Sequence, residues 1–231
     1  MGIIVRPASD TELHRACIIE AAAYADNELN PVLFPGPFPP DSQQKRIEQL
    51  IQIRKDDPTA AYLQAIDQAS GRMIAFAKWH IYSTPEKASA PSRKLEFGPG
   101  TNAEACINFF GGMVEKKKEI IGHRPHICVF DSLTVIEMVY TCSDIATDLH
   151  MLHTDPAYQG RGAGGALMEW GTQKADELGL PIYLESSPKG HRFYQRHGFK
   201  DVKVLDIDLS KYGSIGTYKQ PLMMREPPVS Q

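Results

Sequence analysis

Two hydrophobic patterns divide the chain into short strands and longer helices. Short apolar runs rich in β-branched residues lie between turn residues and predict strands at 3–8, 60–67, 73–83, 149–154, 181–185, 203–209 and 217–226. Apolar residues that recur every three or four positions predict helices at 9–25, 42–56, 103–122, 163–178 and 188–197. The last hundred residues follow the order βαβ and then αββ, which predicts an α/β fold with an antiparallel end.

Two segments and one dipeptide interrupt these patterns. Residues 30–41 contain five prolines in twelve positions, and residues 83–102 are polar and rich in Pro, Ser and Gly. Both are predicted to be surface loops. The helix at 103–122 is predicted to be disturbed at its glycine pair, Gly111 and Gly112.

Composition narrows the class of protein. The 231 residues have a formal net charge of −3, which argues against a dedicated nucleic-acid binder. No stretch is long and apolar enough for a signal peptide or a membrane span. The widely spaced cysteines are expected to be buried or free thiols, with no zinc site or other metal site. These cysteines are Cys17, Cys106, Cys128 and Cys142. A cytoplasmic protein is therefore expected, and its oligomeric state is left open.

The stretch QGRGAGG at 159–165 is rich in backbone N–H groups and poor in side chains. It lies between a predicted strand and a predicted helix, where the first helical turn leaves N–H donors unpaired. The helix dipole adds partial positive charge, and glycines let a phosphate approach closely. A plain tight turn is the structural alternative.

Two phosphate ligands are compatible with this stretch. Gly160, Gly162 and Gly165 satisfy G-x-G-x-x-G, and Glu185 follows about twenty residues later, as in a dinucleotide site. Against that interpretation, the residues DPAYQ separate the strand from the first glycine. The chain after Glu185 also supplies one helix and two strands where a dinucleotide fold needs further βαβ units.

The whole phrase LHTDPAYQGRGAGGALM resembles a signature of the GCN5-related N-acetyltransferase (GNAT) superfamily, with Gln159, Gly162 and Gly164 at its named positions. LESSPKGHRFYQRHGFKDV resembles the second signature of that family, which Tyr194 and Gly198 match. The resemblance implies a single mixed, mostly antiparallel twisted sheet that is flanked by helices and splayed at the cofactor strand. It also implies one N-acetyltransferase domain over 1–231, with its cofactor-binding core at about 149–202.

The same resemblance implies a binding site for acetyl-CoA as co-substrate. Leu152 and Thr154, with His153 between them, would present backbone N–H groups to the thioester. Ser187 stands where many members of the family have an Asn that binds the cofactor arm. The pyrophosphate would be held by residues from Gln159 to Gly164, namely Gln159, Gly160, Arg161, Gly162, Ala163 and Gly164.

Three residues are candidates for proton transfer. Tyr194 is the predicted donor to the leaving thiolate, because a phenol can protonate a thiolate that lies close to it. A packed aromatic beside Phe193 is the alternative role for Tyr194. Glu185 and His150 are candidate general bases for the acceptor amine; their alternatives are a helix cap and a solvent-facing side chain.

The predicted activity is direct transfer of an acetyl group to a primary amine on a small molecule. A protein amine and a non-catalytic acyl-CoA sensor are the alternatives. Residues 129–147 form a possible insertion, since their removal would join RPHIC to DLHMLHTDP and restore the length that the family leads us to expect. A second hypothesis holds that this segment is a translated intron, because its codons can contain GT, CTGAC and CAG.

Overall fold

The computed structural model describes residues 2–89, 97–129 and 151–228, which form one eight-stranded sheet. Its strands are β1 Ile3–Pro7, β2 Ala60–Asp67, β3 Arg72–Tyr82, β4 His126–Cys128, β5 Met151–Thr154, β6 Ile182–Glu185, β7 Lys200–Asp208 and β8 Thr217–Arg225. The strand order is β1-β2-β3-β4-β6-β8-β7, and β5 pairs with β3 beside this path. Among these pairs only β4 and β6 run parallel. The predicted mixed, mostly antiparallel sheet is confirmed.

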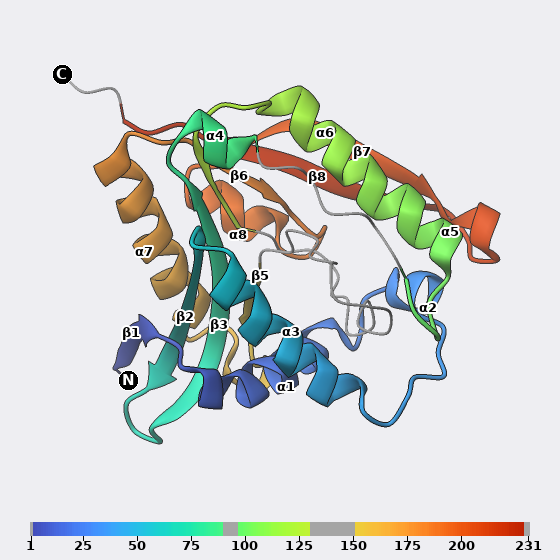
Figure 1. Cartoon of the computed structure of the whole chain (residues 1–231), viewed down its shortest axis with the longest axis horizontal. Helices are drawn as coiled ribbons and strands as arrows, with labels where there is room; N and C mark the ends of the chain where they lie inside the picture. The colour runs from blue at the N-terminus through green and yellow to red at the C-terminus, as the bar shows by residue number, and fades with distance from the viewer. Residues whose placement is uncertain (1, 90–96, 130–150, 229–231) are drawn as a thin grey trace.

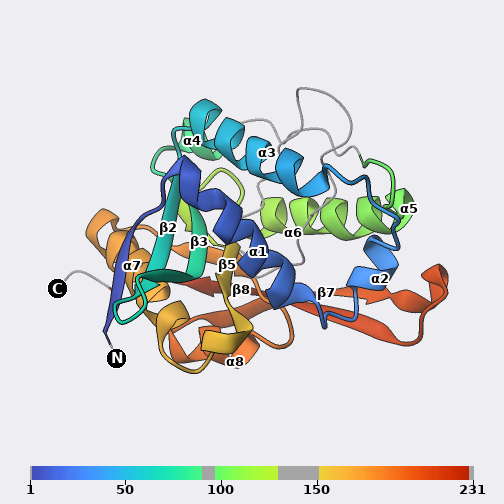
Figure 2. The same ribbon diagram turned by 90° about the horizontal axis from the view of Figure 1, so that it is seen from below.

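Helices cover both faces of the sheet (Figure 1). They are α1 Leu13–Tyr24, α2 Asn30–Leu33, α3 Ser42–Asp56, α4 Pro85–Ala88, α5 Ala103–Cys106, α6 Gly112–Ile120, α7 Ala163–Leu178 and α8 His191–Arg196. Figure 2 shows α1, α3 and α6 on one side of the sheet and α7 and α8 on the other. Each side has its own apolar core: Leu167 and Met168 of α7 pack with Trp79, whereas Leu13 and Leu50 pack with Phe76.

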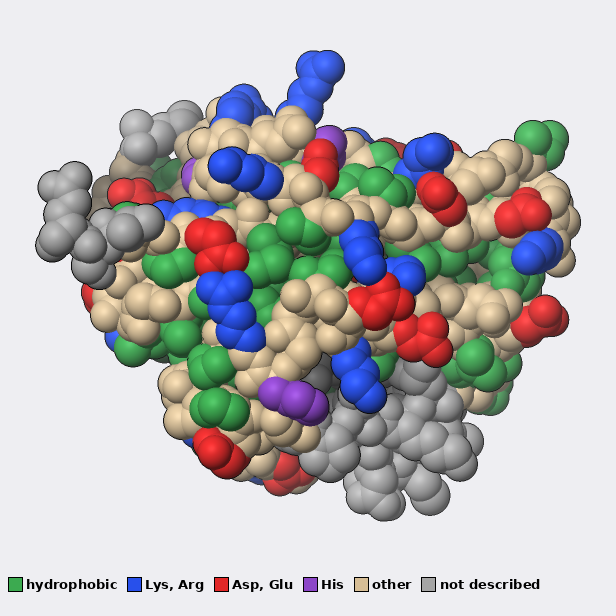
Figure 3. All heavy atoms as spheres, turned by 90° about the horizontal axis from the view of Figure 1, so that it is seen from above, with side chains coloured by type: hydrophobic (Ala, Val, Ile, Leu, Met, Phe, Trp, Pro, Cys, Tyr) green, Lys and Arg blue, Asp and Glu red, His purple; other side chains and the backbone are tan. Residues whose placement is uncertain are grey.

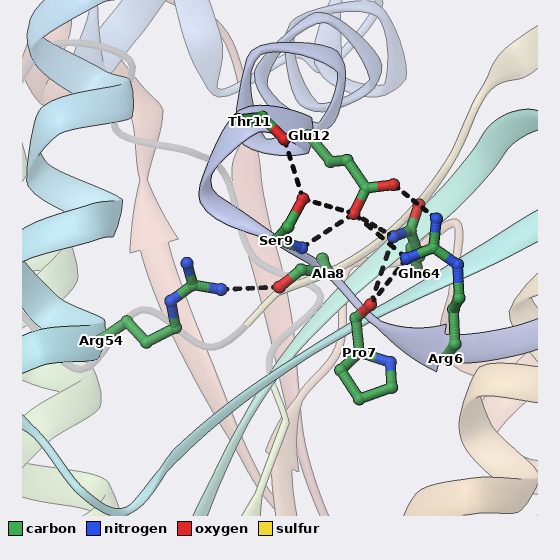
Figure 4. A network of polar contacts seen from close by, with 8 residues as sticks. All are labelled: Arg6, Pro7, Ala8, Ser9, Thr11, Glu12, Arg54 and Gln64. Carbon is green, nitrogen blue, oxygen red and sulfur yellow. Dashed lines mark hydrogen bonds and ion pairs between the residues drawn. The ribbon is translucent and has the colours of Figure 1, made fainter.

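An N-terminal cap at Ser9 organises the junction between β1, β2 and α1 (Figure 4). Ser9 and Glu12 form a capping box, in which the Glu12 carboxylate accepts a hydrogen bond from the backbone N–H of Ser9 at 2.8 Å. Arg6 and Gln64 also donate to Glu12, each at 2.6 Å. Burial alone would raise the pKa of Glu12, but these hydrogen bonds outweigh it and lower the pKa to about 2.

The predicted irregular segments are partly wrong. The proline-rich segment contains the helical turn α2, and the second predicted loop contains the turn α4, whose N-cap is Thr84. The glycine pair does not break the third predicted helix, because a π-helical stretch at Ile107–Gly111 joins α5 to α6 without interruption. A Cβ on Gly112 would lie 3.2 Å from Leu205, so this glycine allows close packing on β7.

The face above α6 has charges of both signs (Figure 3). Lys116 and Lys203 both form ion pairs with Glu119, and Lys117 lies over the ring of Tyr82 at 5.0 Å. Basic and acidic side chains are therefore interspersed on this face. Within the described parts of the chain, no helix has the length and apolar content needed to span a membrane.

Strands β4 and β5 pair with successive stretches of the same strand, β3. Residues 126–128 pair with β3 from Tyr82 to His80, and residues 151–154 pair with it from Lys78 to Ala75. Only Trp79 lies between these two ladders. Among the described residues, the ladder on this side of β3 ends at Cys128 and begins again at Met151. The possible insertion at 129–147 lies in this interval, and apart from Val129 it is outside the described residues.

Candidate active site

A cleft of about 800 Å³ opens where β5 and β6 diverge. Strand β5 pairs only with β3, and β6 pairs with β4 and β8, so no ladder joins β5 to β6. The cleft walls come from the end of α1 and the loop after it, β5, the glycine-rich turn with the start of α7, residues 187–190, α8 and Tyr218 of β8. The site therefore draws on elements from both faces of the sheet.

Backbone donors of β5 point into the gap. Directly after this strand, the N–H of Asp155 donates to the carbonyl of Ile74 on β3 at 2.9 Å. In an antiparallel ladder the bonding direction alternates from residue to residue. The N–H groups of Leu152 and Thr154 therefore face away from β3, and both residues line the cleft. This is the placement that the resemblance led us to expect.

The start of α7 presents further donors to the same cleft. The first hydrogen bond of this helix runs from the N–H of Ala166 to the carbonyl of Gly162, so the N–H groups of Ala163, Gly164 and Gly165 have no partner within the helix. Gly162 has a φ of 93°, a value that favours glycine. The arrangement suits a phosphate ligand.

Gly164 also has a steric reason to lack a side chain. A Cβ there would lie 3.3 Å from Oγ1 of Thr154 and 3.6 Å from Leu152. The added atom would crowd the contact between α7 and β5 on the cleft wall. The residues present therefore fit a coenzyme A ligand.

Not every predicted cofactor residue reaches the cleft. Residues from Gln159 to Gly164 line it with the exception of Arg161, whose guanidinium lies over the Tyr158 ring at 4.9 Å. Two basic residues that the sequence did not single out, Lys189 and Arg196, line the cleft on the side of α8. Sequence reasoning missed these two residues because the pattern of their segment predicted only a short helix.

Tyr194 lies on α8, is fully buried and lines the cleft. Its ring centroid is 5.1 Å from that of Phe193 and 5.8 Å from that of Phe199, so the residue is also part of the core. Ser187 lines the same cleft, and its Oγ accepts a hydrogen bond from the N–H of Gly190 at 3.1 Å. Ser187 thus caps a turn, but α8 begins later than predicted, at His191.

Glu185 is the last residue of β6 and is fully buried. The hydroxyl of Tyr183 donates to its Oε1 at 2.9 Å, and its Oε2 has no hydrogen-bond partner among the described residues. Burial raises the pKa of Glu185 to about 8, although the Tyr183 hydrogen bond and the charge of Lys117 oppose the rise. Glu185 is not on the cleft wall and caps no helix. His150 lies outside the described residues.

The structure adds a pair of residues that the sequence could not bring together. His153 is 129 positions from Tyr24, yet its Nε2 and the Tyr24 hydroxyl form a 2.8 Å hydrogen bond. Both residues line the cleft. Burial lowers the pKa of His153 to about 4, so the ring is neutral at pH 7. Beside it, Arg46 and Glu20 form a buried ion pair at 2.9 Å.

Comparisons with known proteins agree with this geometry. The profile of the family described as "Acetyltransferase (GNAT) domain" matches residues 123–201. Over 79 residues the chain is 32% identical to an uncharacterised N-acetyltransferase of Schizosaccharomyces pombe. The match covers 34% of this chain and 33% of that protein, about a third of the relative's length.

Solved structures extend the likeness over the fold. A protein described as histone acetyltransferase HPA2 and related acetyltransferase from Corynebacterium glutamicum is 18% identical, with a TM-score of 0.59 and coverage of 100% of this chain and 99% of that one. The polyamine N-acetyltransferase of Drosophila melanogaster is also 18% identical, with a TM-score of 0.60 and coverage of 97% and 100%. Together, the family profile over residues 123–201, the relative and these structures support the GNAT superfamily.

The GNAT assignment removes the dinucleotide interpretation of the glycine-rich stretch. A doubly wound dinucleotide fold needs repeated parallel βαβ units. The described sheet has a single parallel pair, β4 with β6, and its C-terminal strands β6, β8 and β7 are antiparallel. The glycines of this GNAT domain open a helix toward a splayed strand instead.

Proposed function

We propose that the protein is an acetyl-CoA-dependent N-acetyltransferase that moves the acetyl group directly to a primary amine on a small molecule. One observation supports this most strongly. The outward N–H groups of Leu152 and Thr154 and the unpaired N–H groups at the start of α7 face one cleft. The first pair suits a thioester oxygen and the second set suits a pyrophosphate.

The residues would divide the work as follows. The N–H groups of Ala163 and Gly164 bind the pyrophosphate, and Lys189 and Arg196 add positive charge at the rim. An N–H of β5 donates to the oxygen on which negative charge develops during attack. Tyr194 donates its phenolic proton to the leaving thiolate.

The acceptor nitrogen must lose its proton before or during attack. We assign this step to Glu185, acting through water, because its pKa of about 8 lies close to neutral pH and its Oε2 has no partner among the described residues. Glu185 ends β6 two residues before Ser187, which is on the cleft wall. His150 stays an untested alternative.

The fold does not determine the class of acceptor. The two structures compared above are named for histones and for a polyamine, so a likeness in fold leaves both a protein amine and a small amine open. A non-catalytic acyl-CoA sensor is the alternative from a different class. A cytoplasmic location stays a prediction.

A thermal-shift measurement with acetyl-CoA, CoA and NAD, followed by thiol release from acetyl-CoA with a panel of amines, tests the proposal. We expect stabilisation by acetyl-CoA and CoA but not by NAD, and turnover with at least one amine. Tyr194→Phe should lower kcat by roughly 100-fold or more with an unchanged CoA-induced shift. Tyr212→Phe, which removes a phenol outside the cleft, is the matched control.

Three results would count against the proposal. Stabilisation by CoA without turnover of any amine favours the sensor. Stabilisation by NAD alone excludes acetyl-CoA chemistry. A kcat of Tyr194→Phe equal to that of the control assigns Tyr194 to packing and leaves the thiolate without this donor.

A further inference from the structure

The rims of the cleft have opposite charges. Lys189 and Arg196 lie on the rim formed by α8 and the turn before it, while Asp26 and Glu28 lie on the rim formed by the loop after α1. All four side chains are exposed, and none forms an ion pair with another described residue. A site for a single anionic ligand would not need carboxylates on its second rim.

The acidic rim adjoins a buried polar group with unused bonding capacity. His153 is 2% exposed and lines the cleft beside Tyr24, the last residue of α1. Its Nε2 is bonded to the Tyr24 hydroxyl, whereas its Nδ1 has no hydrogen-bond partner among the described residues. An unsatisfied buried nitrogen is costly unless a ligand or water completes it.

The charge state of His153 makes this end of the cleft suitable for a cation. Burial keeps the imidazole neutral at pH 7, so it does not repel a positive charge. Asp26 and Glu28 follow Tyr24 by two and four positions. Because consecutive Cα atoms lie about 3.8 Å apart, Glu28 is at most about 15 Å from Tyr24 along the chain. The carboxylates are thus within reach of a small ligand whose other end lies at β5.

We propose that the acceptor is a small dication, a primary amine with a second positive charge that Asp26 and Glu28 bind while the reacting nitrogen lies beside His153 and β5. This inference rests on the acetyltransferase function proposed above and specifies its substrate class. The distal ammonium keeps its proton at pH 7, because an alkylammonium has a pKa near 10.4.

The test compares each α,ω-diamine with the alkylamine of the same number of methylene groups. In the intact protein we expect kcat/KM to be at least about tenfold higher for the preferred diamine than for its alkylamine, mainly through KM. The preference should peak at one methylene spacing and shrink as the salt concentration rises. In Asp26→Asn/Glu28→Gln the ratio of the two kcat/KM values should fall toward one.

The control variant is Asp206→Asn/Glu177→Gln, which removes the same charge from exposed residues of β7 and α7 that do not line the cleft. It should keep the diamine preference. Binding of diamine to the CoA-bound protein, measured by calorimetry, gives a second readout that should weaken only in Asp26→Asn/Glu28→Gln.

The outcomes separate the two proposals. Equal kcat/KM values for diamines and alkylamines, or an unchanged preference in Asp26→Asn/Glu28→Gln, overturn the dication assignment and leave the acetyltransferase function intact. A stronger preference for a lysine-containing peptide than for any diamine overturns the small-molecule assignment. Absence of turnover with every amine overturns the function and this inference together.

Discussion

At the scale of single residues, Gly171 shows how closely α7 packs on the sheet. A Cβ at this position would lie 2.0 Å from the Trp79 ring, far inside normal contact distance. Trp79 is fully buried and is the one residue of β3 that lies between the β4 and β5 ladders. The glycine thus allows α7 to pack directly against the Trp79 ring in the core.

We expect Gly171→Ala to lower the free energy of unfolding by about 1–3 kcal/mol, because the indole or the helix must move. Gly165→Ala is the matched control on the same helix, since its Cβ would approach no atom closer than 4.0 Å. The control should be neutral or more stable by up to about 1 kcal/mol, because Ala favours helix. Urea unfolding measures both, and equal effects in the two variants would contradict the packing argument.

At the scale of elements, the split between β4 and β5 decides how β5 joins the sheet. Residues 129–150 separate two ladders that leave only Trp79 between them on β3. If residues 129–148 are removed, two residues remain opposite Trp79 between Cys128 and Met151. In a β-bulge, two residues of one strand lie opposite one residue of its partner, and an antiparallel pair accommodates this arrangement.

We therefore expect the variant without residues 129–148 to fold and to keep its stabilisation by acetyl-CoA. The control lacks residues 129–150, which leaves no residue opposite Trp79 and shifts the register by one. A one-residue slip exchanges the faces of Leu152 and His153, so the control should lose stability and the CoA-induced shift.

Thermal shift distinguishes these two deletions, and sequencing of the transcript addresses the intron hypothesis. A message that lacks these codons supports the hypothesis, and their uniform presence contradicts it. Loss of folding in the shorter deletion would show that residues 129–148 are required by the sheet.

At the scale of the whole molecule, Glu185 links stability to the proposed chemistry. Its pKa rises from 4.5 to about 8 on folding because the carboxyl group is buried. Between these pH values the folded protein holds a proton that the unfolded chain releases, so stability falls as the pH rises. The loss is complete above the folded pKa and is on the order of a few kcal/mol.

Glu185→Gln removes this titration while retaining an oxygen that can accept the Tyr183 hydrogen bond. We expect the variant to gain stability over the parent protein as the pH rises from 5 to 8. Its kcat should be lower and should no longer rise with pH in this range. Urea unfolding at several pH values measures the first effect. Parallel stability curves for the two proteins would contradict the buried titration, and the exposed Glu177→Gln serves as control.

Most of the secondary structure could be predicted because it depends on local patterns. The predicted strands and long helices agree with the structure to within a few residues, and the turn chemistry of Ser9 and of the glycines at 160–165 is local as well. The short turns α2 and α4 were missed, because a single helical turn capped among prolines leaves no periodic signal. The π-helix was missed because it depends on tertiary packing. Gly112 packs closely against Leu205 of β7, which is distant in the sequence.

By itself the sequence predicted the family, the glycine-rich turn before α7 and the cleft residues at the end of β5, since each depends on consecutive positions. Only the tertiary structure decided which side chains share the cleft. Tyr24 meets His153, and Asp26 and Glu28 face Lys189 and Arg196, because the sheet brings α1 and α8 to one gap. It also decided that Glu185 is buried with a raised pKa, since burial depends on every element packed around a residue and not on its neighbours in the chain.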